Sequence, residues 1–217
     1  MGDIFREVDE ELKQERYEKL WRQYRWHIIG AAIVMVAAVA GWQALNAYQT
    51  NQRHAEGQKF AAAAALLVEG KPTEAADAFS GLTRDASSGY GILAQFYQAS
   101  IAAKAGNAVQ AIELYDRIAG DSSAPESMQG LATVLATLQA LKVASITAET
   151  IRNKIQPISG AGKPYRLIAL EILALTAQRE GDLDTARANY RAIVDDPAAA
   201  TGIRTRAAQM LNILGAS

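Results

Sequence analysis

The chain contains no cysteine and only two histidines, His27 and His54. Without cysteine there is no thiol catalysis, no disulfide bond and no cysteine-ligated metal, and the absence suits an oxidising compartment. Both histidines lie near the apolar N-terminal segment, so residues 55–217 contain no imidazole. Because no nucleophile in that region is matched with a base, we expect a protein that is not an enzyme and has no cofactor or metal.

Charge of one sign, aromatic residues and proline are also scarce. The 22 basic and 23 acidic side chains nearly cancel, which argues against nucleic-acid binding. Only 7% of the residues are aromatic and five are proline, whereas alanine forms runs at residues 61–65 and 198–200. Alanine loses no side-chain entropy in a helix, so the composition predicts an all-α fold with almost no sheet.

Residues 26–52 contain no Asp, Glu, Lys or Arg. Within them, residues 28–45 read IIGAAIVMVAAVAGWQAL, close to the roughly 20 residues that cross a hydrocarbon layer of about 30 Å. Aromatic rings prefer the headgroup level, and they flank the segment at both ends: Trp21, Tyr24 and Trp26 on one side, Trp42 and Tyr48 on the other. The pattern predicts a single transmembrane helix over residues 26–48.

Two other interpretations of this segment compete with a permanent anchor. The segment is also compatible with a buried core helix, but the flanking aromatic rings are typical of a membrane span. It would also pass for a cleaved signal peptide with Ala38-Val39-Ala40 as the cleavage site. That leader would be long and acidic and would leave Trp42 just past the cut, so the sequence favours an uncleaved anchor.

The basic residues near the span predict its direction. Five precede it, namely Lys13, Arg16, Lys19, Arg22 and Arg25, and only Arg53 and Lys59 follow closely. Positively charged flanks stay in the cytoplasm, so residues 1–25 are expected there and residues 49–217 on the opposite side. The tail places Ile4, Phe5 and Val8 among charges of both signs, as in an amphipathic helix that docks on a partner or on the membrane, or is simply solvated.

Beyond the anchor the chain repeats one pattern of small and apolar residues. A small residue is followed by glycine after seven residues, alanine after five more, an aromatic residue after four and an aliphatic residue after three. Three units follow it: Ala63, Gly70, Ala75, Phe79 and Leu82; Ala99, Gly106, Ala111, Tyr115 and Ile118; Ala174, Gly181, Ala186, Tyr190 and Ile193. A degenerate unit between the last two has Ala136, Val143, Ala148, Arg152 and Ile155 in these places.

Each position in the pattern has a physical role. The two small residues let antiparallel helices approach closely, and glycine ends the first helix in a left-handed conformation. The aromatic and aliphatic residues lie on one face of the second helix and pack between units. Asn107 and Asp182, directly after their glycines, are expected to cap the second helices.

This spacing resembles the tetratricopeptide repeat, a helix–turn–helix unit of about 34 residues, over residues 56–200. Pro197 follows the last unit as in that family, although the early tryptophan of the family pattern is missing. Residues 204–215 match a terminal half-unit that caps the stack. The resemblance implies a helical solenoid of about four helix pairs plus a C-terminal capping helix.

The layout of tail, anchor and repeat domain resembles the YfgM-type family, an ancillary subunit of the bacterial SecYEG translocon. The resemblance implies an inner-membrane protein whose repeat domain is periplasmic. Its implied partners are the translocon, periplasmic chaperones and unfolded secretory clients, with no catalytic residue involved. Two alternatives stay open: an envelope-assembly scaffold, as in cytochrome c maturation, and a structural oligomeriser, for which Ala37 and Gly41 form a small-x-x-x-small pair.

In tetratricopeptide folds the first helix of each pair lines the concave, protein-binding face. The repeat alignment assigns nine residues to it: Phe60, Phe96, Ser100, Lys104, Thr133, Thr137, Glu171, Gln178 and Arg179. Phe60 and Phe96 are equivalent in successive units. They are either apolar anchors for client segments or ordinary packing residues between helices, and as anchors they would leave the basic residues to steer acidic segments.

Two glycine motifs are misleading. Residues 89–94 match the G-x-G-x-x-A string of dinucleotide-binding proteins, but no strand precedes them, and we interpret them as the loop into the second unit. Residues 160–164 are similar to a phosphate-binding loop, but Pro164 stands where Ser or Thr is required. We interpret this stretch as a linker.

Overall fold

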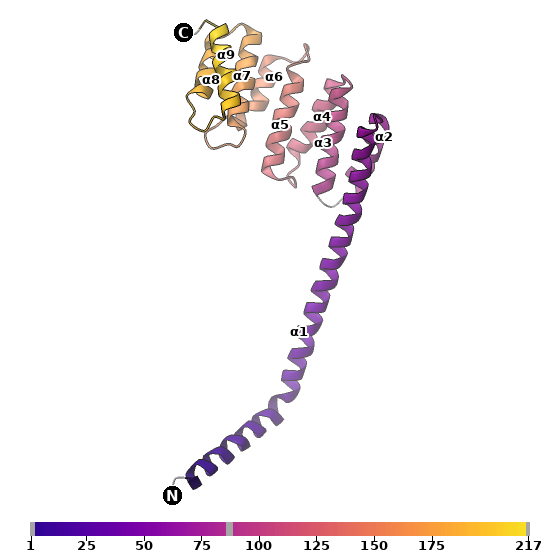
Figure 1. The fold of residues 1–217 in the computed structure, drawn as a ribbon, viewed down its shortest axis with the longest axis vertical. Helices are drawn as coiled ribbons and strands as arrows, with labels where there is room; N and C mark the ends of the chain where they lie inside the picture. Colours follow the sequence, from indigo (N-terminus) through magenta and orange to yellow (C-terminus); the bar gives the residue numbers. More distant parts are fainter. Residues whose placement is uncertain (1–2, 86–88, 216–217) are drawn as a thin grey trace. The chain divides into compact units, whose positions relative to one another are not determined.

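The computed structural model describes residues 3–85 and 89–215 (Figure 1), and within them it contains helices and no strand. The helices are α1 Asp3–Val68, α2 Pro72–Asp85, α3 Gly89–Lys104, α4 Ala108–Gly120, α5 Glu126–Ala140, α6 Ala148–Ile155, α7 Arg166–Glu180, α8 Leu183–Val194 and α9 Thr201–Ile213. A short 3₁₀ helix, η1 Gln156–Ile158, follows α6 directly. The predicted all-α fold is confirmed.

The chain divides into two units, Met1–Ala55 and Glu56–Ser217. In the first unit, α1 contains a window of 18 residues with a mean hydropathy of 2.1 that is fully exposed. By length and composition this helix is able to cross a membrane. The side chains of residues 1–20, on which the predicted amphipathic tail depends, lie outside the described part.

The second unit consists of helix pairs that follow one another in chain order (Figure 1). Residues 56–68 of α1 pair with α2 through a shared core. The next pairs are α3 with α4, α5 with α6, and α7 with α8, and α9 packs against α8 at the end. The predicted arrangement of about four helix pairs and a C-terminal capping helix is confirmed.

The small residues of the repeat pattern lie at the helix contacts, as predicted. At most 1% of the side chain is exposed for each of them in the three regular units: Ala63, Ala75, Ala99, Ala111, Ala174 and Ala186. Gly70, Gly106 and Gly181 have φ angles of +76°, +83° and +82°. Glycine is the residue that adopts this left-handed conformation without strain, so these three positions end the first helices as expected.

The second helix of the third unit differs from the predicted register. The Thr147 hydroxyl accepts a hydrogen bond from the Thr150 N–H at 3.2 Å and so begins α6. Counted from this cap, Ile151 takes the alanine place and Ile155 the aromatic place, and both are fully buried. The assignment of Ala148 and Arg152 to those places is therefore wrong. The physical reason is a longer turn, since residues 141–147 separate α5 from α6.

The first helix of the third unit is displaced by one residue from the prediction. The first helices of the second, third and fourth units each carry three buried residues at spacings of five and three: Ala94, Ala99 and Ala102; Ala132, Thr137 and Ala140; Ala169, Ala174 and Ala177. Thr137, not Ala136, is thus the equivalent of Ala99. Its hydroxyl donates to the Thr133 carbonyl at 2.6 Å, which satisfies the polar group inside the core.

Two local predictions also need correction. Asn107 is the residue before α4, but its side chain accepts no capping hydrogen bond, whereas Asp182 accepts one from the Thr185 N–H at 3.0 Å. Gly89 is the first residue of α3, so residues 89–94 form the beginning of a helix and not a loop. Residues 160–164 lie between η1 and α7 outside any helix, in agreement with a linker.

Candidate protein-binding surface

One face of the first helices is open to solvent in three successive units. Residues at i, i+4, i+7 and i+11 share one side of a helix, and the buried triplets align these positions between units. We call the exposed or half-buried members the first-helix face: Leu93, Tyr97, Ser100 and Lys104 of α3; Leu131, Leu135 and Leu138 of α5, with Lys142 just after its end; Ile168, Leu175 and Arg179 of α7. Ile172, the remaining position in α7, is 1% exposed.

The first-helix face is largely apolar although it is partly in water. Leu131 is 36% exposed and Ile168 37%, and the two are equivalent in adjacent units. Leu93 is half-buried at the same position in α3. Partly exposed apolar side chains that recur at one position in successive units form a surface that suits a protein partner.

A basic residue ends this face in each of the three units. Among the described residues, Lys104, Lys142 and Arg179 make no ion pair with a carboxylate. Arg179 Nη2 donates to the carbonyls of Ala144 at 3.1 Å and Ile146 at 2.7 Å. Lys104 and Arg179 lie in the last turns of α3 and α7, where a cation complements the helix dipole, so these two also stabilise their helices without a partner.

The structure uses Phe60 and Phe96 for packing. The Phe60 ring lies 5.4 Å from Phe79 and 5.3 Å from Tyr97, and the Phe96 ring lies 6.0 Å from Tyr115. Both phenylalanines are half-buried, and each contacts the aromatic residue in the second helix of its own unit. Of the two interpretations left open, the geometry favours packing residues between helices.

The other predicted site residues divide into two groups. Ser100, Lys104 and Arg179 lie on the first-helix face. Thr137 is fully buried, so its assignment to an exposed face is wrong. Thr133 is half-buried, and its hydroxyl donates to the Gln129 carbonyl at 2.9 Å.

The side chains of Glu171 and Gln178 of α7 are also paired or partly buried within the chain. Glu171 accepts from Arg206 Nε at 3.0 Å and Nη2 at 2.9 Å. Gln178 is half-buried, and its Nε2 is buried and has no hydrogen-bond partner among the described residues. Sequence reasoning missed Leu131, Leu138 and Ile168. Their signal is the spacing of apolar residues on the side of each helix away from its buried alanines.

The pair of Glu171 and Arg206 attaches α9 to α7. The hydrogen bonds and charge of Glu171 raise the pKa of Arg206. Burial raises the pKa of Tyr190, and the nearby Glu171 charge adds to the effect. Both shifts favour the protonated, hydrogen-bond-donating forms of Arg206 and Tyr190 at neutral pH, which suits a structural link between α7 and α9.

No cluster suited to a metal lies in the part of the chain that the structure describes, where groups of three or more His, Cys, Asp or Glu side chains are absent. The features of the repeat domain are thus an open apolar face and a row of cations.

Comparison with known proteins agrees with this architecture. The model of the tetratricopeptide repeat-like domain family matches residues 18–150, which is more than half of the chain. Neither a curated protein nor a solved structure matches the chain. The match runs from within α1 through the first two units and α5 to the first turn of α6, so α7, α8 and α9 lie beyond it. The chain therefore belongs to the tetratricopeptide repeat-like domain family.

Proposed function

We propose that this chain is a membrane-anchored, non-enzymatic module that binds polypeptides on its first-helix face. The observation that carries the proposal is the row of exposed apolar side chains in α3, α5 and α7, bordered by three cations without carboxylate partners. Apolar anchors supply affinity in protein interfaces, and unpaired cations attract acidic segments. The tetratricopeptide repeat-like fold, which is typically a protein-binding scaffold, supports this proposal.

In this proposal residues 26–48 span the membrane, residues 1–25 form a cytoplasmic charged amphipathic tail, and residues 49–217 form a periplasmic domain. Support comes from the exposed apolar window of α1 and from the excess of Lys and Arg upstream of it. The absence of cysteine suits an oxidising compartment.

The proposed partners are polypeptides at the membrane surface: the SecYEG translocon, periplasmic chaperones or emerging secretory clients. The layout shared with the YfgM-type family supports this choice. The first-helix face suits an extended chain, because its apolar and basic positions recur once per unit.

Because the chain lacks cysteine, single introduced thiols report its topology. We expect Gln110→Cys, an exposed position of α4, to react with a membrane-impermeant maleimide in intact spheroplasts. Gly2→Cys in the tail should react only after the cells are lysed. Labelling of the tail before lysis, or a mature chain that begins near Gly41, would refute the anchor.

Binding is tested with a chemically unfolded, acidic model polypeptide and a photo-cross-linking residue at Ser100. The double change Leu131→Asp and Ile168→Asp should abolish the cross-link. It replaces two apolar side chains of the face by negative charges, which repel the acidic polypeptide. The melting temperature should fall but the domain should stay folded, because both side chains are more than one-third exposed; Leu131→Ser with Ile168→Ser, which lose the same apolar area without the charge, separate lost binding from lost stability. Gln110→Asp is the control. Undiminished cross-linking in the double variant would leave a scaffold or an oligomeriser as the better explanation.

A further inference from the structure

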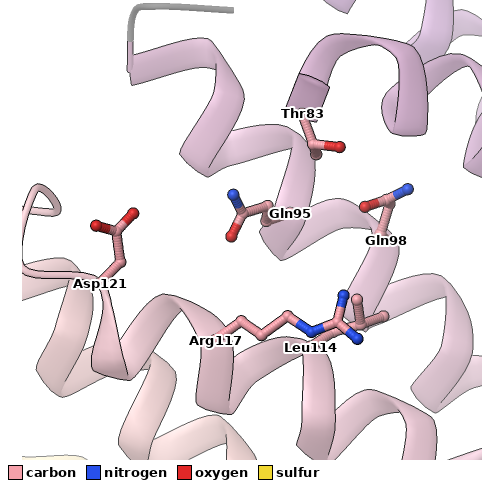
Figure 2. A pocket seen from close by; sticks show the side chains of 6 residues that line it. All are labelled: Thr83, Gln95, Gln98, Leu114, Arg117 and Asp121. Atoms are coloured by element: carbon pink, nitrogen blue, oxygen red, sulfur yellow. The ribbon is translucent and has the colours of Figure 1, made fainter. Parts of the chain in front are cut away.

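A polar cleft lies between α2, α3 and α4. It has a volume of about 310 Å³ and is lined by Thr83, Gln95, Gln98, Leu114, Arg117 and Asp121. Figure 2 shows the side chains of these residues around an open space, with α3 at its back. The volume is at the lower end of the roughly 300–1,000 Å³ of ligand pockets. We call this site the polar cleft.

The polar cleft is not part of the first-helix face. With 3.6 residues per helical turn, Gln95 and Gln98 point away from the side of α3 that carries Leu93, Tyr97 and Lys104. The two surfaces therefore lie on roughly opposite sides of α3, and a ligand of one leaves the other free.

A second cleft of about 370 Å³ lies at the equivalent place two units later, between α6, α7 and α8. Leu170 and Leu173 line this second cleft in the places of Gln95 and Gln98. Their separation in sequence from the glutamines equals that between the equivalent residues Ala99 and Ala174. A cleft at this place is thus a consequence of the repeat geometry. The two glutamines are not a consequence of the repeat geometry, because leucine occupies their positions in the second cleft, which we call the matched cleft.

The polar groups of the cleft are only partly used within the chain. Among the described residues Arg117 and Gln95 have no hydrogen-bond partner and Arg117 no ion pair. Gln98 Nε2 donates to the Ala76 carbonyl at 3.2 Å, which leaves its Oε1 free to accept. The Thr83 hydroxyl donates to the Ser80 carbonyl at 2.9 Å, so its oxygen is also an acceptor.

Asp121 stands at one end of the polar cleft. Its Oδ1 accepts hydrogen bonds from the Ser123 hydroxyl at 2.7 Å and the Ser123 N–H at 2.8 Å. These bonds hold the pKa of Asp121 below its usual range. Its carboxylate is bonded to the turn after α4, so the exposed Arg117 is the charged group of the cleft that is available to a ligand.

We propose that the polar cleft binds a short extended polypeptide segment that carries an acidic side chain. The carboxylate pairs with the Arg117 guanidinium, whose parallel N–H groups match its two oxygens. The main chain of the segment presents N–H and C=O groups alternately, and a glutamine carboxamide offers one partner for each. Gln95 donates to a carbonyl of the segment, and Gln98 Oε1 accepts from an N–H.

The test uses the full chain in detergent micelles and three blocked peptides, acetyl-Ala-X-Ala-amide with Glu, Gln or Lys at X. We expect the Glu peptide to shift the side-chain amide NMR resonances of Gln95 and Gln98 saturably. The Gln peptide should bind roughly tenfold more weakly, since it loses the charge-assisted pair. The Asn189 amide, which lines the matched cleft, should not move.

Two variants make the test specific. Arg117→Gln should remove the preference for Glu. The double change Gln95→Leu and Gln98→Leu gives the polar cleft the apolar floor of the matched cleft and removes the Gln98 hydrogen bond to the Ala76 carbonyl, so the melting temperature should fall only slightly. Peptide binding, followed for this variant through the backbone N–H resonance of Arg117, should be lost. Equal shifts with all three peptides, no saturable shift, or a preference that survives Arg117→Gln would overturn the proposal. None of these results bears on the first-helix face.

Discussion

Two glycines in first helices give space to tyrosine rings of the following unit. A Cβ on Gly57 would lie 3.0 Å from the Tyr90 hydroxyl, and one on Gly130 would lie 2.7 Å from Cδ2 of Tyr165. The Tyr165 hydroxyl donates to the Ser127 carbonyl at 2.9 Å, which anchors the ring. Tyr90 and Tyr165 occupy equivalent places two units apart, so the same glycine–tyrosine contact joins the first unit to the second and the third to the fourth.

Replacement of Gly130 by alanine tests this contact. The added methyl group would overlap the Tyr165 ring, and overpacking of this kind costs about 1–3 kcal/mol of unfolding free energy. Gly81→Ala in α2 is the matched control, because its Cβ would meet nothing within 4 Å. That change should stabilise the helix by about 0.5–1 kcal/mol. Chemical denaturation measures the change in unfolding free energy for both variants. A change of the same sign in the two variants would contradict the contact between Gly130 and Tyr165.

At the scale of the element, two second helices begin with the same hydrogen bond from different side chains. The Asp182 carboxylate and the Thr147 hydroxyl each accept from the backbone N–H three residues later. Hydrogen bonds from Thr185 are the largest cause that lowers the pKa of Asp182, and the charge of Arg152 lowers it further. The cap of α8 therefore titrates with pH, and the cap of α6 does not.

The pH dependence follows from the sign of this shift. Because the folded-state pKa of Asp182 is lowered, its stabilising contribution is present above the ordinary aspartate pKa and is lost as the pH falls through the folded value. Asp182→Asn keeps a capping oxygen but removes the charge. We expect the difference in melting temperature between wild type and variant to shrink on acidification. A difference independent of pH would show that the carboxylate charge does not stabilise α8.

At the scale of the whole molecule, the last helix closes the repeat domain. Ala207 and Leu211 of α9 are buried in one cluster with Ala174, Tyr190 and Ile193. Arg187 Nε and Nη2 donate to the Leu214 carbonyl at 3.0 and 2.8 Å. An end repeat in a solenoid needs such a cover, because each unit contacts only its neighbours.

Truncation after Ala200 should expose this cluster and destabilise the adjacent units first. In hydrogen exchange, we expect α7 and α8 to lose protection while α3 and α4 keep most of theirs, since coupling in a solenoid is between neighbours. Arg206→Ala is the control that removes only the ion pair to Glu171, and it should cost at most about 1 kcal/mol because the pair is partly exposed. Uniform loss of protection along the domain would contradict this account.

The sequence by itself determined the features that depend on local chemistry. The apolar side chains of residues 28–45 make this segment hydrophobic whatever surrounds it. Gly70, Gly106 and Gly181 end helices because the left-handed backbone is strained for other residues, and Ala99, Ala111, Ala174 and Ala186 lie at contacts because only small side chains let helix axes approach. These constraints act within a few residues, so the helices, their pairing and the capping helix were predictable.

Only the tertiary structure decided the register of the third unit and the composition of the binding surface. The repeat spacing favours Ala136, because Ala148 and Ile155 follow it at the expected distances. Both Ala136 and Thr137 are fully buried, and only the packing of the neighbouring helices puts Thr137 in the place of Ala99. The longer turn over residues 141–147 shifts α6 in a way that no fixed period encodes. Whether Phe60 faces a groove or a core likewise depends on Phe79 and Tyr97, which approach it from other helices and are brought there by the fold alone.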